Sequence, residues 1–471
     1  MVKKRLERVV ESEAGKGCKN SWTGPLRALL SSLAIIVLLP AALAAQAASP
    51  TASAASQATV YGSGYQLPLE FERERAPADQ VSLRVGASAF YDDNVLGSNA
   101  DRLSDEALSF DAGLGIQHRT DRLTLNFDYV PFFILYRQVT GYDRVNHALN
   151  LSLSYRLSSR FLLALQDDFS YQNGVYPTLT EQPILSGPPP PDSSNGIINP
   201  YSVRTLADRG GLYLTFMKSR RTSIILSGAY NQSKYGASRQ YPNLPLYNGT
   251  GLSGGLTLQH HVTAHTSLGV LALHQDTTYQ GGQILGNRLH IQIESAYISF
   301  ASLLAPGVKI SLFGGPQYVR SVGSTSSAAT LSSHFQPSGG GSITKEVRKT
   351  ALDLTITRSV TDGGGLYSSV VDTRVFFGVR RRLVGLWEAR VHADAAREET
   401  SLFRFVNGRI EGLIGGVSVS RPLLARGATL RFSYESMHQL NNGVLPSAAN
   451  FDRNQLAVGF DYQLKGFSLG R

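Results

Sequence analysis

The stretch Leu123-Thr124-Leu125-Asn126-Phe127-Asp128-Tyr129 decides the fold. Apolar residues occupy its alternate positions, and Thr, Asn and Asp occupy the positions between them. Because successive side chains of a β-strand point to opposite faces, this pattern predicts a strand with one apolar and one polar face. The same alternation recurs in segments 149–157, 352–357, 429–435 and 455–465.

Short turns punctuate these segments and recur about every forty residues. Their centres lie near Asp121, Ser159, Arg220, Ala264, Pro306, Arg348, Val384 and Leu424. Two alternating segments, joined by a looser polar connection, lie between consecutive turns. We therefore predict an all-β fold over residues 81–471: a single up-and-down antiparallel transmembrane barrel of 16 to 18 strands, with about 18 as the preferred count. The barrel is expected to close because an open sheet of this length would leave unpaired edges.

Strand length separates a membrane barrel from a soluble sandwich, which alternation alone would also fit. The pattern from Asp121 to Tyr136 is much longer than the roughly 5 to 6 residues of a soluble strand. Phe132, Phe133 and Tyr136 lie toward the end of this segment, where the aromatic girdles of membrane barrels are found. We expect short periplasmic turns, longer extracellular loops and a water-filled lumen.

Residues 1–45 have the pattern of a secretory signal peptide. A basic segment is followed by the apolar run 28–39 and by small residues with A-x-A patterns that place cleavage near 44–47. A membrane-anchor helix is the alternative, but the run is short for the ~20 residues that such a helix needs. Cys18 is the only cysteine, so the mature chain is expected to have no disulfide and no cysteine metal site.

Residues 46–80 begin with an Ala/Ser-rich linker and continue as a mixed segment. We expect this part to be a flexible periplasmic lead-in to the barrel. A small plug, or a segment that docks a partner, is the alternative.

Two neighbouring segments place charges on the face that would line the lumen. These candidate pore-lining residues are Glu388, Arg390, His392 and Asp394 in one segment and Asp372, Arg374 and Arg380 in the preceding one. A charge on the lipid face would cost roughly 2 to 4 kcal/mol at the midplane, so the lumen is the expected location. Mutual pairing without any selection of solute is an equal alternative.

The connection from Gln172 to Tyr201 is the longest one. It contains a candidate constriction made of Pro188, Pro189, Pro190, Pro191 and Asp192. As the third outer connection, it is expected by analogy with other porins to fold inward and narrow the pore. A stiff external polyproline spacer is the alternative.

Two other clusters of polar residues are explained better by turns than by metal binding. His260, His261 and His265 have no carboxylate or cysteine beside them in the sequence. Asp92-Asp93-Asn94 offers too few oxygens for Ca²⁺, which takes about 6 to 8, and Asp and Asn are ordinary turn residues. We therefore expect no metal site and no cofactor.

The chain carries little that points to catalysis. It contains no H-E-x-x-H motif. Glu435 and His438 lie close in sequence near an outer rim, but such a pair is common by chance. We expect that the protein is not an enzyme.

Two short stretches resemble a known family. Ala87-Ser88-Ala89-Phe90-Tyr91-Asp92-Asp93-Asn94-Val95 and the hairpin from Leu153 to Asp167 are similar to segments of the β-barrel porins encoded in exopolysaccharide synthesis and export loci of Gram-negative bacteria. The resemblance covers 81–471 in pattern and only these stretches in residue identity. It implies an outer-membrane barrel that conducts a secreted polysaccharide. One departure is the C-terminus, where Phe467 is followed by four residues instead of ending the chain.

The expected function is an outer-membrane channel for a hydrophilic solute, with exopolysaccharide export as the main hypothesis. A general or solute-specific diffusion porin and a structural or adhesive surface barrel are the alternatives. The expected partners are outer-membrane lipid, a polysaccharide and periplasmic export machinery, and a homo-oligomer remains open. Nucleic acid is not an expected partner, because the net charge of +10 is scattered along the chain instead of being clustered.

Overall fold

The computed structural model describes residues 79–99, 102–174, 203–236, 246–281, 288–324, 329–363, 367–400, 408–423, 427–442 and 450–464. All of them belong to one compact unit, Ala54–Arg471. Within these residues the chain forms strands and two short 3-10 helices, η2 (Thr140–Tyr142) and η3 (Val384–Leu386). No helix among them is long and apolar enough to span a membrane.

The strands of the described ranges are β1 (Asp79–Asp92), β2 (Asp105–Arg119), β3 (Leu123–Tyr136), β4 (Arg144–Arg156), β5 (Phe161–Gly174), β6 (Val203–Met217), β7 (Thr222–Tyr235), β8 (Asn248–His261), β9 (Thr266–Gln280), β10 (Arg288–Ala305), β11 (Val308–Ser324), β12 (Ala329–Val347), β13 (Thr350–Gly363), β14 (Tyr367–Arg382), β15 (Glu388–Thr400), β16 (Arg409–Pro422), β17 (Ala428–Asn442) and β18 (Phe451–Gln463).

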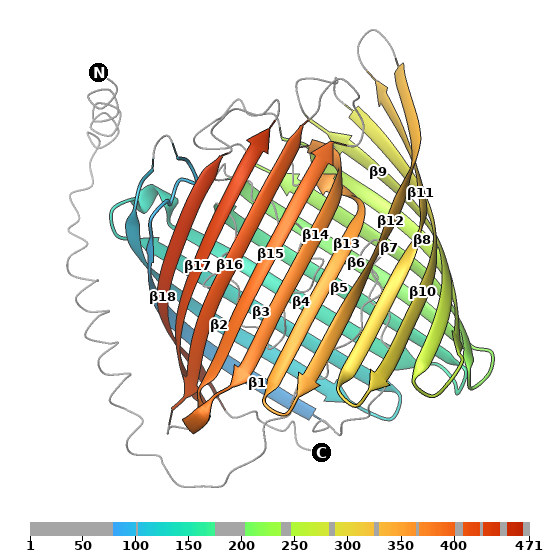
Figure 1. The fold of residues 1–471 in the computed structure, drawn as a ribbon, viewed down its shortest axis with the longest axis horizontal. Helices are drawn as coiled ribbons and strands as arrows, with labels where there is room; N and C mark the ends of the chain where they lie inside the picture. Colours follow the sequence, from blue (N-terminus) through green and yellow to red (C-terminus); the bar gives the residue numbers. More distant parts are fainter. Residues whose placement is uncertain are drawn as a thin grey trace. The chain divides into compact units, whose positions relative to one another are not determined.

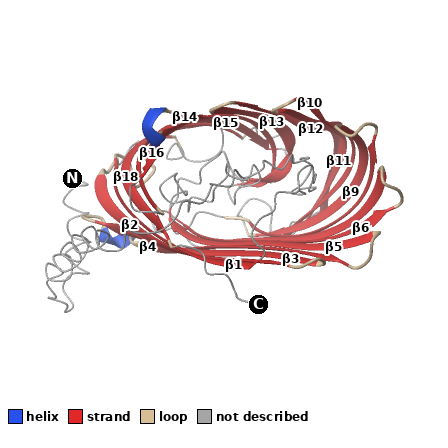
Figure 2. Cartoon of the chain, turned by 90° about the horizontal axis from the view of Figure 1, so that it is seen from below, coloured by secondary structure: helices blue, strands red, loops and turns tan. Residues whose placement is uncertain are grey.

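These strands form one closed antiparallel barrel (Figure 1). Each strand pairs with its neighbours in the sequence, and β1 closes the ring by pairing with β18 from Arg84↔Gln463 to Asp92↔Gln455. The predicted up-and-down barrel is confirmed, with 18 strands. Seen along its axis, the ring of strands is flattened instead of circular (Figure 2). β1 begins at Asp79, slightly earlier than the Val81 that the pattern predicts.

Several of the tight connections share a local cause. Hydroxyl groups accept hydrogen bonds from backbone N–H groups two or three residues later, as Ser and Thr do in turns. Thr120 Oγ1 accepts from Leu123 N at 2.9 Å, Ser158 Oγ from Arg160 N at 3.1 Å, and Ser219 Oγ from Thr222 N at 3.1 Å. These turns all lie at one end of the barrel, which we call the turn end, and the opposite end is the loop end. β1 starts and β18 ends at the turn end, since Asp79 pairs with His118 and Arg84 pairs with Gln463.

Candidate functional site

The outward face of the barrel is apolar. Large hydrophobic side chains are exposed at alternate positions along most strands; examples are Leu212, Leu226, Leu252, Leu256, Val270, Ile298, Leu312, Ile356, Phe377, Leu413, Phe432 and Leu456. In a bilayer, backbone hydrogen bonds must be satisfied within the protein, and a closed barrel satisfies all of them between strands. An exposed apolar wall on such a barrel defines the class of protein: a transmembrane β-barrel of the outer-membrane type.

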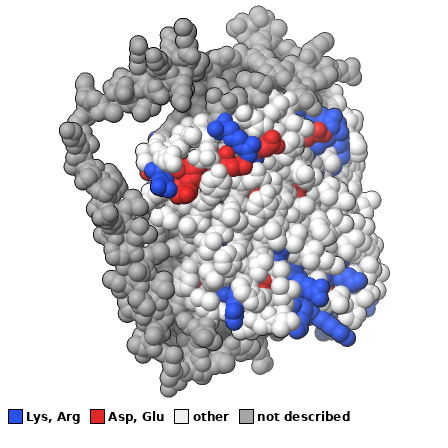
Figure 3. Space-filling view, turned by 60° about the vertical axis from the view of Figure 1, so that its left-hand side comes forward, with Lys and Arg blue, Asp and Glu red and all other residues white. Residues whose placement is uncertain are grey.

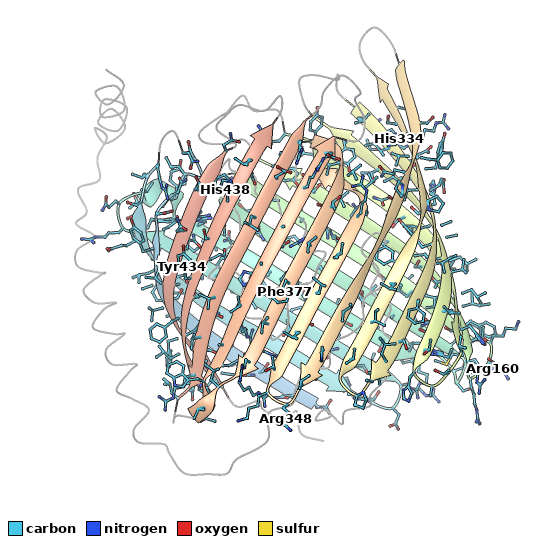
Figure 4. The ribbon with its side chains drawn as sticks, viewed as in Figure 1. Arg160, His334, Arg348, Phe377, Tyr434 and His438 are labelled. Carbon is cyan, nitrogen blue, oxygen red and sulfur yellow. The ribbon has the colours of Figure 1, made fainter. Side chains whose placement is uncertain are left out.

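Charged side chains border this apolar wall at both ends. Toward the loop end, acidic and basic groups are paired across the outward face, in Arg397–Glu399, Arg409–Glu411, His438–Asp452, Arg102–Asp93 and Arg137–Glu106. At the turn end the exposed charges are mostly basic; they include Arg122, Arg156, Arg160, Lys218, Arg220, Arg221, Arg348, Lys349, Arg381 and Arg382. Figure 3 shows the paired charges above an uncharged band and the basic groups below it. Figure 4 places Arg160 and Arg348 at the turn end and His438 toward the loop end.

The inward face is polar along β14, β15, β17, β18 and β1. On β15, Val391 is exposed outside, while Asp394 and Glu398 face inward and are buried. By this alternation, Glu388, Arg390 and His392 share the inward face with Asp394. The register of β14 against β15 puts Asp372, Arg374 and Arg380 on the same inward face, because Arg374 is opposite Ala396 and Arg380 is opposite Arg390.

The central interaction of this charged wall joins Arg374 and Asp394. The Nε of Arg374 donates to both carboxylate oxygens of Asp394, at 2.8 and 2.9 Å, and its Nη2 also donates to Asp394. Both side chains are nearly buried. Asp372 lies two residues before Arg374 on the same strand face, and Glu398 is opposite Asp372, so three carboxylates lie near this guanidinium.

Two further pairs extend the wall toward the turn end. His392 Nε2 lies 3.8 Å from Glu435 Oε2. β16 lies between the two strands that carry them. Its residue Gly416 is opposite both His392 and Glu435 and has no side chain to come between them. Arg390 Nε donates to Glu388 Oε1 at 2.7 Å. These contacts place the candidate residues on one wall; their role in selecting a solute remains a prediction.

A second charged site closes the barrel, and we call it the seam cluster: Asp92, Asn94, Arg453 and Gln455. Asp92 and Arg453 are both fully buried, and Arg453 Nε donates to the two Asp92 oxygens at 3.1 Å each. Gln455 Nε2 and the backbone N of Asn94 also donate to Asp92, at 2.9 and 3.0 Å. Sequence patterns missed this site because Asp92 and Arg453 lie 361 positions apart.

Two groups of residues that lie close in sequence are divided between the two faces of the barrel wall. Glu435 is buried on the inward face and His438 is exposed on the outward face, where it pairs with Asp452, so they do not form one site. Phe132 and Tyr136 are also buried on the inward face, and only Phe133 is exposed on the outside. The aromatic cluster of β3 is therefore not a girdle as a whole, because its residues alternate between the two faces.

The segment Gly251-Leu252-Ser253-Gly254-Gly255 fits the G-x-S-x-G spacing found around some nucleophilic serines. It lies inside β8, and Ser253 pairs with Ala229 on one side and Gln275 on the other. A nucleophilic serine of this motif needs a sharp turn between a strand and a helix. The observed geometry is that of an ordinary strand.

The candidate constriction, Pro188 to Asp192, lies outside the described residues, as do the proposed signal peptide and lead-in up to residue 78. The histidines near the turn after β8 are within the described part. There, His260 Nδ1 lies 3.0 Å from Thr222 Oγ1. Across the described ranges, no group of three or more His, Cys, Asp or Glu side chains is arranged to hold a metal ion.

Comparisons with known proteins give similarity in structure alone. No family model matches the chain, and no curated protein matches it in sequence. The ferric citrate transporter FecA, unliganded, is similar with a TM-score of 0.44 and 12% identity, over 82% of this chain and 64% of that one. Pseudomonas aeruginosa OpdQ gives a TM-score of 0.41 and 10% identity, over 82% and 98%.

Another Pseudomonas aeruginosa structure, OccK2 (OpdF) in complex with glucuronate, gives a TM-score of 0.41 and 12% identity, over 82% of this chain and 98% of that chain. This chain thus spans 64% of the length of FecA and nearly all of the other two. At such identities and scores, functional conclusions have to come from the residues of this chain.

Proposed function

We propose that the protein is an outer-membrane diffusion channel for small hydrophilic solutes. The observation that carries this proposal is the combination of an apolar outer wall with an inward wall that carries Arg374, Asp394, His392 and Glu435 in a ring of 18 strands. Rings of about 16 to 18 strands leave an aqueous channel, whereas rings of about 8 are filled by side chains.

The chemistry of the inward wall suits water and ions. Carboxylates and guanidinium groups on a wall without water would be strongly unfavourable unless every one were paired. Near Arg374, the carboxylates of Asp372, Asp394 and Glu398 outnumber its guanidinium. The local excess of negative charge favours cations over anions at this level of the channel.

The polysaccharide-export hypothesis has weaker support. No contact or charge among the described residues distinguishes a polysaccharide from any other hydrophilic solute, and none identifies a docking site for export machinery. The diffusion channel therefore replaces it as the preferred function. A closed structural or adhesive barrel is the remaining alternative.

Planar bilayer recordings test the proposal. Protein refolded in detergent, with its folded state verified by slower migration of unheated than heated samples on a gel, is added to one side of the bilayer. We expect discrete conductance steps and a cation-selective reversal potential in a salt gradient. Folded protein that inserts and produces no steps would leave the closed barrel as the better description.

Liposome swelling distinguishes a diffusion channel from a channel for polysaccharide export. Entry of monosaccharides and disaccharides that slows with solute size indicates a diffusion channel. Exclusion of these sugars together with passage of long polysaccharide chains would favour export instead.

A further inference from the structure

The ladder between β12 and β13 ends well before either strand does. The two strands pair only from Val347↔Thr350 to Gly339↔Arg358. β12 continues in the other direction to Ala329 and stays paired with β11 over this part, while β13 continues to Gly363 and stays paired with β14. The wall of the barrel therefore divides at Gly339 and Arg358 into two hairpins. The β11–β12 hairpin rises at the loop end (Figure 1).

Burial shows where the other hairpin goes. On the outward face of β13 and β14, Ile356 and Val375 are opposite each other and are 48% and 38% exposed. Two pairs further along the same face, Val360 and Val371 are opposite each other, yet they are only 7% and 8% exposed. Some other part of the protein thus covers the outward face of this hairpin beyond Arg358.

The covering surface is the inward face of β9, β10 and β11. Val360 belongs to a buried cluster whose other members are Tyr279, Leu289, Ile291, Ile293 and Val319. A hydrogen bond fixes the contact, because the backbone N of Val360 donates to Gln317 Oε1 at 3.3 Å. The Nε2 of the same Gln317 donates to Ser295 Oγ at 3.2 Å. The buried amide of Gln317 therefore joins β13 to the inner surface of β10 and β11.

Glycine and proline residues explain why the wall divides here. Gly314-Gly315-Pro316 on β11 is opposite Pro337-Ser338-Gly339 on β12. Pro316 has no N–H group, and β10 and β11 have no paired residues between Ser295↔Gln317 and Ile298↔Gly314. A Cβ at Gly315 would lie 1.8 Å from the carbonyl oxygen of Ala296, so only glycine allows this close approach of the two backbones.

We propose that the loop-end part of the β13–β14 hairpin, residues Ser359–Thr361 with Val370–Asp372, is an inner layer that narrows the channel and sets its size limit. This inference rests on the proposed channel function. In this arrangement the constriction comes from the barrel wall itself, and Gln317 is the residue that positions it. Asp372 then lies at the constriction, next to Arg374 and Asp394.

The size of the effect follows from sheet geometry. Eighteen strands about 4.8 Å apart and tilted by about 40° give a circular ring roughly 36 Å across between backbones. Two packed sheets are about 10 Å apart, so an inner layer removes more than a quarter of this span. The flattening of the ring makes the fraction larger along the short direction of its cross-section.

The first test releases the layer with Val360→Asp. A carboxylate among Tyr279, Ile291 and Val319 would be buried without a partner, so the hairpin is expected to leave the inner wall. We expect single-channel conductance to rise about 1.5-fold, in line with the removed layer, and larger polyethylene glycols to enter the channel. Ile225→Asp is the matched control, because Ile225 is an equally buried inward residue in a cluster that β13 does not join. It should fold to a similar extent and leave the polymer cut-off unchanged.

The second test locks the layer. Val360→Cys and Val319→Cys are combined with Cys18→Ser, and a short bifunctional thiol reagent is added to the folded protein. We expect cross-linking in the folded state and a conductance equal to that of the wild type. Absence of cross-linking in folded protein, or equal cut-offs for the two Asp variants, would overturn the inner-layer inference. If the wild type itself carries no current, it is the proposed channel function that fails.

Discussion

Replacing Arg453 by Met should destabilise the barrel more than any exposed charge replacement. Asp92 and Arg453 are both 0% exposed in their side chains, and they join the first strand to the last. Methionine preserves the length of the side chain and removes the charge. Asp92 would then keep only Gln455 Nε2 and the backbone N of Asn94 as donors, in a site without solvent.

The expected cost follows from the isolated charge that remains. Removing one partner of a buried ion pair costs about 3 to 5 kcal/mol, because the other charge stays buried without compensation. Since each 1.4 kcal/mol corresponds to a tenfold change, the ratio of folded to unfolded protein should fall roughly a hundred- to several-thousand-fold. Arg102→Met provides the control. Arg102 pairs with Asp93 in the neighbouring loop, but it is 44% exposed, and loss of such a pair costs about 0 to 1 kcal/mol.

Urea titration of folded protein in lipid vesicles, followed by tryptophan fluorescence and by the gel shift on heating, measures both variants. The double variant Asp92→Leu/Arg453→Met separates pairing from packing. It should recover at least about 2 kcal/mol relative to Arg453→Met, because no unpaired charge remains. A cost below about 1 kcal/mol for Arg453→Met, or additive effects in the double variant, would refute the role assigned to the seam cluster.

Two further changes test the charged wall and the membrane-facing wall. Arg374→Ala leaves Asp372 and Asp394 without their guanidinium, so the cation-to-anion permeability ratio from reversal potentials should rise about two-fold at 0.1 M salt. The rise should be much smaller at 1 M salt, where the Debye length is about 3 Å. Arg381→Ala, at an exposed turn-end position of the same strand, should leave the ratio unchanged. Leu256→Arg puts a charge at a 53% exposed site in the middle of β8 and should reduce the free energy of unfolding in vesicles by about 2 to 4 kcal/mol. Val262→Arg, beside the turn, should reduce it by only about 0 to 1 kcal/mol. Equal costs for the two variants would contradict the placement of the apolar wall in lipid.

The sequence was sufficient to predict the strands and their faces. Alternation with period two is a local property, so Leu123 to Tyr129 could be recognised as a strand without knowledge of its neighbours. The up-and-down order then followed from the short turns, where Ser158 and Ser219 provide the hydrogen bonds. The inward position of Arg374 and Asp394 followed from the same alternation.

Contacts that depend on register could not be predicted in this way. The pairing of Asp92 with Arg453 requires the ring to close with one particular offset, and no local pattern encodes that offset. The pair of His392 and Glu435 depends on Gly416 lying between them on β16. The division of the wall at Gly339 has a local signal, the runs of Gly and Pro on both strands of one hairpin, which typically mark bends in sheets.

The charged borders of the outer wall fix how deep the barrel sits. A shift of the barrel along the membrane normal by about 5 Å, equivalent to about two residues of a tilted strand, would bring one row of charges into hydrocarbon. Shifting toward one side would immerse Arg160 and Arg348, and shifting toward the other would immerse the Arg397–Glu399 pair. The protein thus matches a bilayer of one hydrophobic thickness, and a thicker or thinner membrane would have to deform around it.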